Sequence, residues 1–177
     1  MFSTWIDSRQ YNFKSWSEKK DILLYSPDIH PLKQRILDKI KIELPHIKQV
    51  LCWGFKYEEC KEVMANAKYS LTFGEGFDGY FIEPIFCNTF GFAVYSDVFF
   101  PSDEFKKCAG VFLSYQDLEN NICNVIKKIE IDEQFRIAEH IKIFDKINPL
   151  YSVDKYSQNI KDFYVEKYNF IPNINII

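Results

Sequence analysis

Ser70-Leu-Thr-Phe-Gly-Glu75-Gly-Phe-Asp-Gly-Tyr-Phe-Ile-Glu83-Pro84 is the segment from which we infer both the fold and the candidate site of this chain. Its first residues are mostly apolar, closely spaced glycines interrupt them, and a second apolar run follows. This order predicts a strand, a tight loop and then a helix whose N-terminus faces a ligand. Because the first turn of a helix has unpaired N–H groups and about half a positive charge, such an arrangement favours phosphate.

Two glutamates separated by seven residues give this segment its chemistry. Glu75 falls on the loop, at the expected ligand, and Glu83 lies about one turn inside the helix. A carboxylate in that place accepts hydrogen bonds from the vicinal hydroxyls of a ribose. Phosphate, sugar and ribose together predict a nucleotide-sugar as the ligand.

The rest of the sequence alternates short apolar runs with segments of helical periodicity. This alternation predicts an α/β fold, a Rossmann-like parallel sheet with helices on both faces. Ligands of such sheets bind beyond the carboxyl ends of the strands, which is where Glu75 is expected. We expect strands at 21–26, 47–53, 69–73, 90–96 and 110–113, helices at 31–44, 57–67, 80–88, 133–146 and 154–166, and a further helix that begins at Ser114-x-x-Asp117.

The length of 177 residues allows one domain with a substantial core, because a chain of this size buries roughly 70% of its unfolded surface. Its apolar fraction of 47% and aromatic fraction of 18% favour a globular chain over a disordered one. We expect a linker-like segment at 1–20, a ligand-binding domain at 21–170 and a tail at 171–177. The charged run Glu18-Lys-Lys-Asp21 is expected to be solvated.

Charge and cysteine content exclude several classes of partner. The net charge is −3 and no basic patch stands out, so we expect no nucleic-acid partner. No apolar run reaches the roughly 20 residues that span a bilayer, and no signal peptide is present, which predicts a soluble cytoplasmic protein without an integral membrane segment. Five cysteines without C-x-x-C spacing predict reduced, mostly buried thiols and no metal site; they are Cys52, Cys60, Cys87, Cys108 and Cys123.

The spaced glutamates resemble a motif of GT-B glycosyltransferases, E-G-F-G-L-P-x-x-E-A-x-A-x-G-x-P-V-x-x-S, found in the donor-binding C-terminal domain of the retaining group that includes family 4. This chain has Glu75-Gly-Phe-Asp-Gly-Tyr-Phe-Ile-Glu83, and it continues to Ser96-Asp97. The resemblance covers nearly the whole chain. The first strand of that domain is similar to Ile22-Leu-Leu-Tyr-Ser-Pro with Lys33. Two later helices of the family are similar to Asp117-Leu-Glu-Asn-Asn-Ile122 and Ile160-Lys-Asp-Phe-Tyr164, and the interdomain linker is similar to Trp5-Ile-Asp7 with Phe13.

The resemblance implies a single GT-B half-domain that transfers a sugar from a nucleotide-diphosphate-sugar to an acceptor. Transfer would retain the anomeric configuration, need no metal or other cofactor, and serve glycan or polysaccharide synthesis, in the cytoplasm or at the inner membrane face. Glu75 would contact the donor sugar, Lys33 would neutralise the departing diphosphate, and Glu83 would bind the ribose. The other implied substrate-binding residues are Gly76, Phe77 and Asp78, whose amides would face the sugar and phosphates, together with Gly79 and Phe55.

Three departures from the motif leave alternatives open. Where an arginine often follows the first strand this chain has Ser26-Pro27-Asp28, with a protonated His30 as a partial substitute. Asp78 replaces a glycine beside the phosphates, and Asn88 replaces another glycine at a position where asparagine tolerates a left-handed conformation. The alternatives are a non-catalytic or degenerate nucleotide-sugar-binding module and a sugar-nucleotide epimerase of GT-B type.

The chain corresponds to one of the two GT-B domains, so the resemblance also implies a partner. That partner would be a missing N-terminal acceptor-binding domain or a separate subunit. We therefore expect an excised domain, half of a two-subunit enzyme, or a decayed remnant.

Each candidate residue also has a purely structural interpretation. Glu75 and Glu83 suit a solvated loop and a helix N-terminus, and Lys33 is exposed by default on an amphipathic helix. An aromatic wall for the base, or else core packing and rim exposure, explains Trp53, Phe55 and Tyr57.

Overall fold

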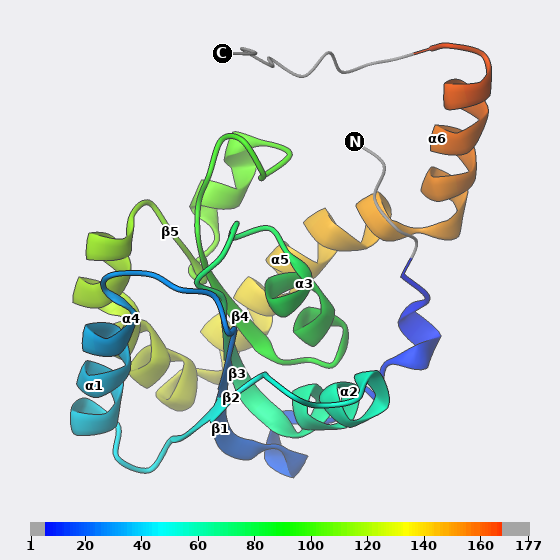
Figure 1. Cartoon of the computed structure of the whole chain (residues 1–177). Coiled ribbons are helices and arrows are strands. Elements are labelled where there is room, and N and C mark those ends of the chain that lie inside the picture. Colours follow the sequence, from blue (N-terminus) through cyan, green and yellow to red (C-terminus); the bar gives the residue numbers. More distant parts are fainter. Residues whose placement is uncertain (1–5, 168–177) are drawn as a thin grey trace.

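The computed structural model describes residues 6–167, which form five parallel strands enclosed by helices (Figure 1). This confirms the predicted α/β Rossmann-like fold. The strands are β1 (Lys20–Tyr25), β2 (Lys48–Leu51), β3 (Ala67–Leu71), β4 (Phe90–Val94) and β5 (Val111–Phe112). The helices are α1 (Lys33–Glu43), α2 (Tyr57–Asn66), α3 (Gly79–Phe86), α4 (Tyr115–Ile131), α5 (Glu133–Tyr151) and α6 (Val153–Tyr164), with three short 3-10 turns, η1 (Ser8–Gln10), η2 (Trp16–Glu18) and η3 (Asp103–Lys107).

The strands are arranged in the order β2-β1-β3-β4-β5. The chain moves outward from β1 to β2 and then returns to the other side of β1, where β3 pairs with it in parallel. The topological switch point therefore lies between the carboxyl ends of β1 and β3, the usual place for a ligand in this class of sheet.

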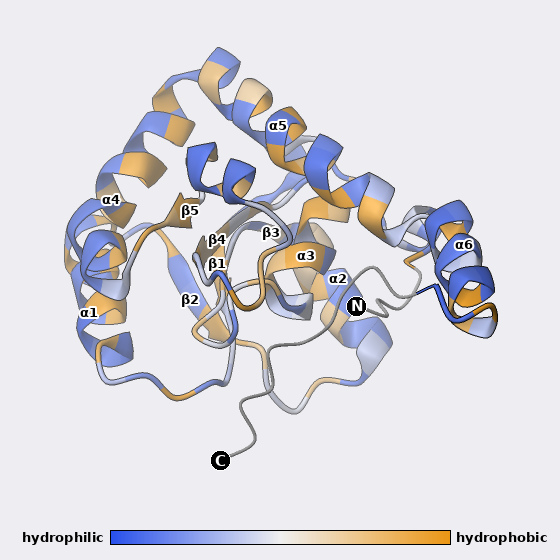
Figure 2. Ribbon diagram, turned by 90° about the horizontal axis from the view of Figure 1, so that it is seen from above, coloured by the Kyte–Doolittle hydropathy of each residue, from blue (hydrophilic) through white to orange (hydrophobic). Residues whose placement is uncertain are grey.

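Helices cover both faces of the sheet, as Figures 1 and 2 show. On one face α1 and α4 pack on the strands through residues such as Ile36, Ile40 and Ile122, all of which are fully buried. On the other face α2, α3 and α5 supply a second core that includes Met64 and Phe81. Each fully buried side chain of this kind contributes about 1.5–3 kcal/mol to folding.

Local sequence accounts for where the key elements begin and end. Ser114 caps α4, its hydroxyl accepting a hydrogen bond from the amide of Asp117, as the capping sequence predicts. Asp78 caps α3 in the same manner. After α3 the chain turns at Asn88, whose φ of 63° is the left-handed conformation expected for this position.

The structure corrects the expectation of a fully solvated Glu18–Asp21 run. Lys19 has an exposed fraction of only 6%, and its ammonium donates to the carbonyls of Ala65 and Ala67 and to the hydroxyl of Thr89. These three acceptors use all three N–H groups of the lysine. Lys19 thus fastens the beginning of β1 to the junction of α2 and β3.

The segment before β1, predicted to be linker-like, packs against the domain in the part that is described. Tyr11 is 8% exposed and belongs to the core beside α3, where its ring lies 5.8 Å from that of Phe86. At the other end α5 is longer than predicted and continues to Tyr151. Trp5 and the tail at 171–177, also part of the sequence predictions, lie outside the described residues.

Candidate functional site

The switch point is built by polar contacts between the ends of β1 and β3. The amide of Phe73 donates to the hydroxyl of Ser26 over 2.8 Å, and the amide of Ser26 donates to the carbonyl of Leu71. Lys33 extends its ammonium back to the same place and donates to the carbonyls of Ser26 and Asp28, at 2.7 and 2.8 Å. Burial lowers the pKa of Lys33.

Glu83 lies on α3 close to this edge of the sheet and has two tyrosine partners. Its Oε2 accepts a hydrogen bond from Tyr11 at 2.9 Å and a longer one from Tyr57 at 3.4 Å, and the two tyrosine hydroxyls are 2.9 Å apart. Burial raises the pKa of the Glu83 carboxyl, and the two hydroxyl donors oppose that rise. Glu83 is therefore a half-buried carboxylate held in a fixed orientation.

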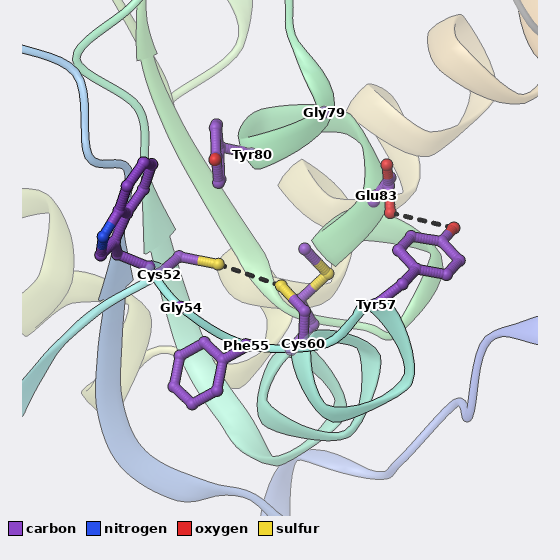
Figure 3. Close-up of a pocket in the computed structure, with 10 residues that line it drawn as sticks. Cys52, Gly54, Phe55, Tyr57, Cys60, Gly79, Tyr80 and Glu83 are labelled. Atoms are coloured by element: carbon purple, nitrogen blue, oxygen red, sulfur yellow. Dashed lines mark hydrogen bonds between the residues drawn. The ribbon is translucent and has the colours of Figure 1, made fainter.

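A cleft of about 500 Å³ opens beside Glu83 (Figure 3). One wall is the connection from β2 to α2, where Gly54 adopts a φ of 78° and Trp53 is 72% exposed. The opposite wall is the beginning of α3. The lining residues are Cys52, Trp53, Gly54, Phe55, Tyr57, Cys60, Met64, Gly79, Tyr80 and Glu83.

A second cleft, of about 410 Å³, shares Tyr57, Gly79 and Glu83 with the first. The segment before β1 forms part of its lining, and Tyr151 at the end of α5 contributes as well. Glu83 thus lines both clefts. The remaining lining residues are Ile6, Asp7, Gln10, Tyr11, Phe77, Asp78 and Ile82.

Asp78 lies at the N-terminus of α3, the place where the sequence predicts a bound phosphate. Its carboxylate accepts hydrogen bonds from the amide of Phe81 at 3.1 Å and from the hydroxyl of Thr72 at 2.6 Å. Burial raises its pKa, and the nearby charge of Asp28 adds to the rise. A Cβ on Gly74 would lie 2.9 Å from Asp28 and 3.2 Å from Asp78, so the two carboxylates converge on this loop.

The loop between β3 and α3 places Glu75 and Gly76 differently from each other. Glu75 is exposed and lines neither cleft. Gly76 is buried with a φ of 84°, and a Cβ there would overlap the carbonyl of Val94, so only glycine fits. Phe77 packs against Phe100 and Phe105 with ring centroids 5.1 and 5.2 Å apart.

The structure therefore brings only some of the predicted site residues together. Glu83 and Gly79 line both clefts, Phe55 lines the first, and Phe77 and Asp78 line the second. Glu75, Gly76 and Lys33 line neither.

His30, which the sequence offers as a partial substitute for the missing arginine, lines neither cleft. Its ring stacks on Tyr115 with the ring centroids 3.4 Å apart, and burial lowers the pKa of its imidazole, which disfavours the protonated form.

Sequence reasoning missed two features of the site. Tyr11 comes from a segment without periodicity, and no pattern in the sequence connects it with Glu83. The paired thiols of Cys52 and Cys60 lie 3.0 Å apart across the wall of the first cleft, but their spacing matches no known motif.

Comparison with protein families, with curated proteins and with solved structures finds no match for this chain. Within residues 6–167 no group of three or more His, Cys, Asp or Glu side chains is placed to hold a metal ion. No helix in the same range has the length and apolar character needed to cross a membrane.

Proposed function

We propose that this domain binds a nucleotide-diphosphate-sugar in the cleft beside Glu83 and is the donor-binding half of a retaining glycosyltransferase. The observation that carries the proposal is the placement of Glu83. It lies on the helix that follows β3, and its carboxylate is held by Tyr11 and Tyr57. It faces a cleft large enough for a nucleotide, between the β2–α2 connection and the beginning of α3.

The two carboxylate oxygens of Glu83 have different surroundings. Both tyrosine hydroxyls donate to Oε2, and none of the hydrogen bonds described for residues 6–167 reaches Oε1. Oε1 lies 3.1 Å from the place where a Cβ on Gly79 would be. The absence of a side chain at Gly79 keeps Oε1 accessible, so this oxygen is the one that would accept the hydroxyls of a ribose.

The base of the nucleotide would lie against the wall between β2 and α2. Phe55 and Trp53 are aromatic, line the cleft and remain 39% and 72% exposed. An aromatic face stacks on any base and contributes about 1–3 kcal/mol. This wall supports binding of a nucleotide without defining which base.

Transfer requires the bond between the anomeric carbon and the diphosphate oxygen to break, and negative charge then develops on the diphosphate. In this proposal Lys33 stabilises that charge, and Glu75 on the neighbouring loop contacts the donor sugar. Lys33 now donates to two carbonyls, so it must release at least one of them to reach a phosphate. The acceptor would be bound by another domain or subunit.

A second candidate function is nucleotide binding without catalysis, and the position of Asp78 favours it. Its carboxylate occupies the end of α3 and lies close to that of Asp28, so a diphosphate there would meet two negative charges. A ligand with fewer phosphate charges would bind more readily.

The two functions are distinguished by titration followed by product analysis. The protein is titrated with UDP, GDP, ADP and their hexose conjugates, and bound conjugates are then incubated with and without oligosaccharide acceptors. Release of nucleoside diphosphate, with the anomeric configuration of the donor retained in the product, supports the transferase. Binding without turnover supports a nucleotide site and is expected both of the module and of a donor-binding half that lacks its acceptor-binding partner. An epimerised sugar in the absence of an acceptor identifies an epimerase, and no binding of any nucleotide contradicts the proposal.

A further inference from the structure

We infer that Cys52 and Cys60 form a peroxide-reactive dithiol, a modification site in the wall of the first cleft. Their Sγ atoms are 3.0 Å apart, and Figure 3 shows the two sulfurs facing each other across the connection between β2 and α2. A disulfide has a bond length of about 2.05 Å, so an approach of about 1 Å suffices to join them. This inference is independent of which ligand the cleft binds.

The two thiols have different roles. Cys60 is the fourth residue of α2, within its first turn, where the helix dipole favours a thiolate. The hydrogen bond from Cys52 also lowers the pKa of Cys60, whereas the same contact and burial raise the pKa of Cys52. Cys60 is therefore the attacking sulfur, and Cys52 is the resolving one.

Joining the two thiols in a disulfide removes two electrons, and a hydroperoxide is the oxidant that accepts them. The Cys60 thiolate attacks the terminal peroxide oxygen, an S–O bond forms, the O–O bond breaks, and the alkoxide leaves and takes up a proton. The sulfur of Cys52 then attacks the sulfenic acid of Cys60. An S–S bond forms, the S–O bond breaks, and hydroxide leaves with the proton of Cys52 as water.

The other three cysteines are poor candidates for the same reaction. Cys87, Cys108 and Cys123 are buried with exposed fractions of 3% or less, and burial raises the pKa of each thiol. No described contact pairs any of them with another sulfur. All five cysteines lie within the described residues and are free thiols.

The bridge would change the cleft as well as the thiols. It closes a short ring that contains Trp53, Gly54 and Phe55 and ties this exposed aromatic wall to α2. In the reduced protein backbone hydrogen bonds anchor the wall, the amide of Cys52 donating to the carbonyl of Tyr25 and that of Trp53 to the carbonyl of Leu51. Oxidation is therefore expected to hold the aromatic wall in one position relative to α2 and so to fix the shape of the cleft.

Peptide mapping tests the inference, because Lys56 lies between the two cysteines and trypsin cleaves after it. Protein treated with hydrogen peroxide, alkylated and digested without reduction should yield peptides 49–56 and 57–61 joined, with the loss of two hydrogens, and dithiothreitol should separate them. Cys60→Ser should abolish the product, Cys52→Ser should leave a sulfenic acid on Cys60 that dimedone traps, and the control Cys123→Ser should behave as wild type.

The wild-type experiment decides the matter even if a variant fails to fold. Three results would overturn the inference: oxidation of Cys87, Cys108 or Cys123 before the pair, a pair that stays reduced in hydrogen peroxide, or sulfenic acids that dimedone traps on the wild-type pair without a bridge forming.

Discussion

Glu83 illustrates how the surroundings of one side chain set its chemistry. Burial alone raises the pKa of this carboxyl and favours its neutral form, which accepts hydrogen bonds poorly. The hydroxyls of Tyr11 and Tyr57 act in the opposite sense and keep the group able to accept hydroxyls from a ligand. The two tyrosines contribute unequally, because their distances to Oε2 are 2.9 and 3.4 Å.

We predict that Tyr11→Phe destabilises the protein more than Tyr57→Phe. The shorter hydrogen bond to a charged group is worth about 1.5–3 kcal/mol, and the longer one lies at the limit of useful geometry. Urea unfolding of both variants at pH 7 measures the difference. Equal losses for the two variants would show that the Tyr11 hydroxyl does not hold Glu83.

Lys19 leads to a prediction at high pH. Burial lowers its pKa to about 8, against about 10.4 in an unfolded chain. Between these values the unfolded state binds more protons, so the free energy of unfolding contributed by Lys19 rises with pH, by up to about 3 kcal/mol. The measurement is the free energy of unfolding of wild type minus that of Lys19→Met, at pH 8 and at pH 10. We expect this value to increase with pH, and a decrease would contradict the prediction.

At the scale of elements, two helices with the same serine cap differ in how far they are packed into the core. Ser114 caps α4, which contributes Leu118 and Ile122 to the core, whereas Ser152 caps α6, a helix with no buried residue. Both serines accept a hydrogen bond from the amide three residues along. The same local motif therefore supports a packed helix in one place and a separate one in the other.

We predict that Ser114→Ala lowers the global free energy of unfolding by about 1 kcal/mol. The matched variant Ser152→Ala should leave global unfolding unchanged, because losing α6 exposes no core. Urea unfolding followed by tryptophan fluorescence reports the global value for both variants. An equal loss in both would mean that α6 unfolds together with the rest of the domain.

Strand and helix positions were predictable because each has a local cause. Glycines end β3, an apolar stripe follows Ser114, and Asn88 turns the chain after α3. The extension of α5 to Tyr151 was not predictable, because Pro149 in its last turn is a residue that normally ends a helix earlier.

At the scale of the whole molecule, the site depends on contacts that are distant in sequence. Tyr11 and Glu83 are 72 residues apart, and Lys19 and Thr89 are 70 apart. Neither pair leaves a periodic signal, so the sequence indicated Glu83 but not what holds it. The sequence left two interpretations open for Trp53, Phe55 and Tyr57, a wall for the base or core packing with exposure at the rim. In the structure all three side chains are exposed and line the first cleft.

The global stability should also depend on acid pH through His140 on α5. Burial, together with the charge of Lys19, lowers the pKa of His140 to about 4, against about 6.5 when unfolded. Because the unfolded state binds the extra proton, stability falls as the pH drops from about 6.5 through about 4, by roughly 1–3 kcal/mol. His140→Gln should reduce this slope; thermal unfolding across this pH range provides the test, and a slope that is unchanged in the variant would contradict the prediction.

The proposed ligand site is tested most directly by thermal unfolding of wild type, Glu83→Gln and Glu133→Gln with UDP, GDP, ADP and their sugar conjugates. Glu133 is an exposed carboxylate, paired with Arg136, that lines neither cleft. Ligand at 100 times its dissociation constant adds about 2.7 kcal/mol, which for a chain of this size raises the midpoint by about 5–11 °C. We predict such a rise with at least one nucleotide for wild type and Glu133→Gln and its loss in Glu83→Gln. A rise that persists unchanged in Glu83→Gln, or no rise with any nucleotide at millimolar concentration, would contradict the assignment of the cleft beside Glu83 as a nucleotide-sugar site.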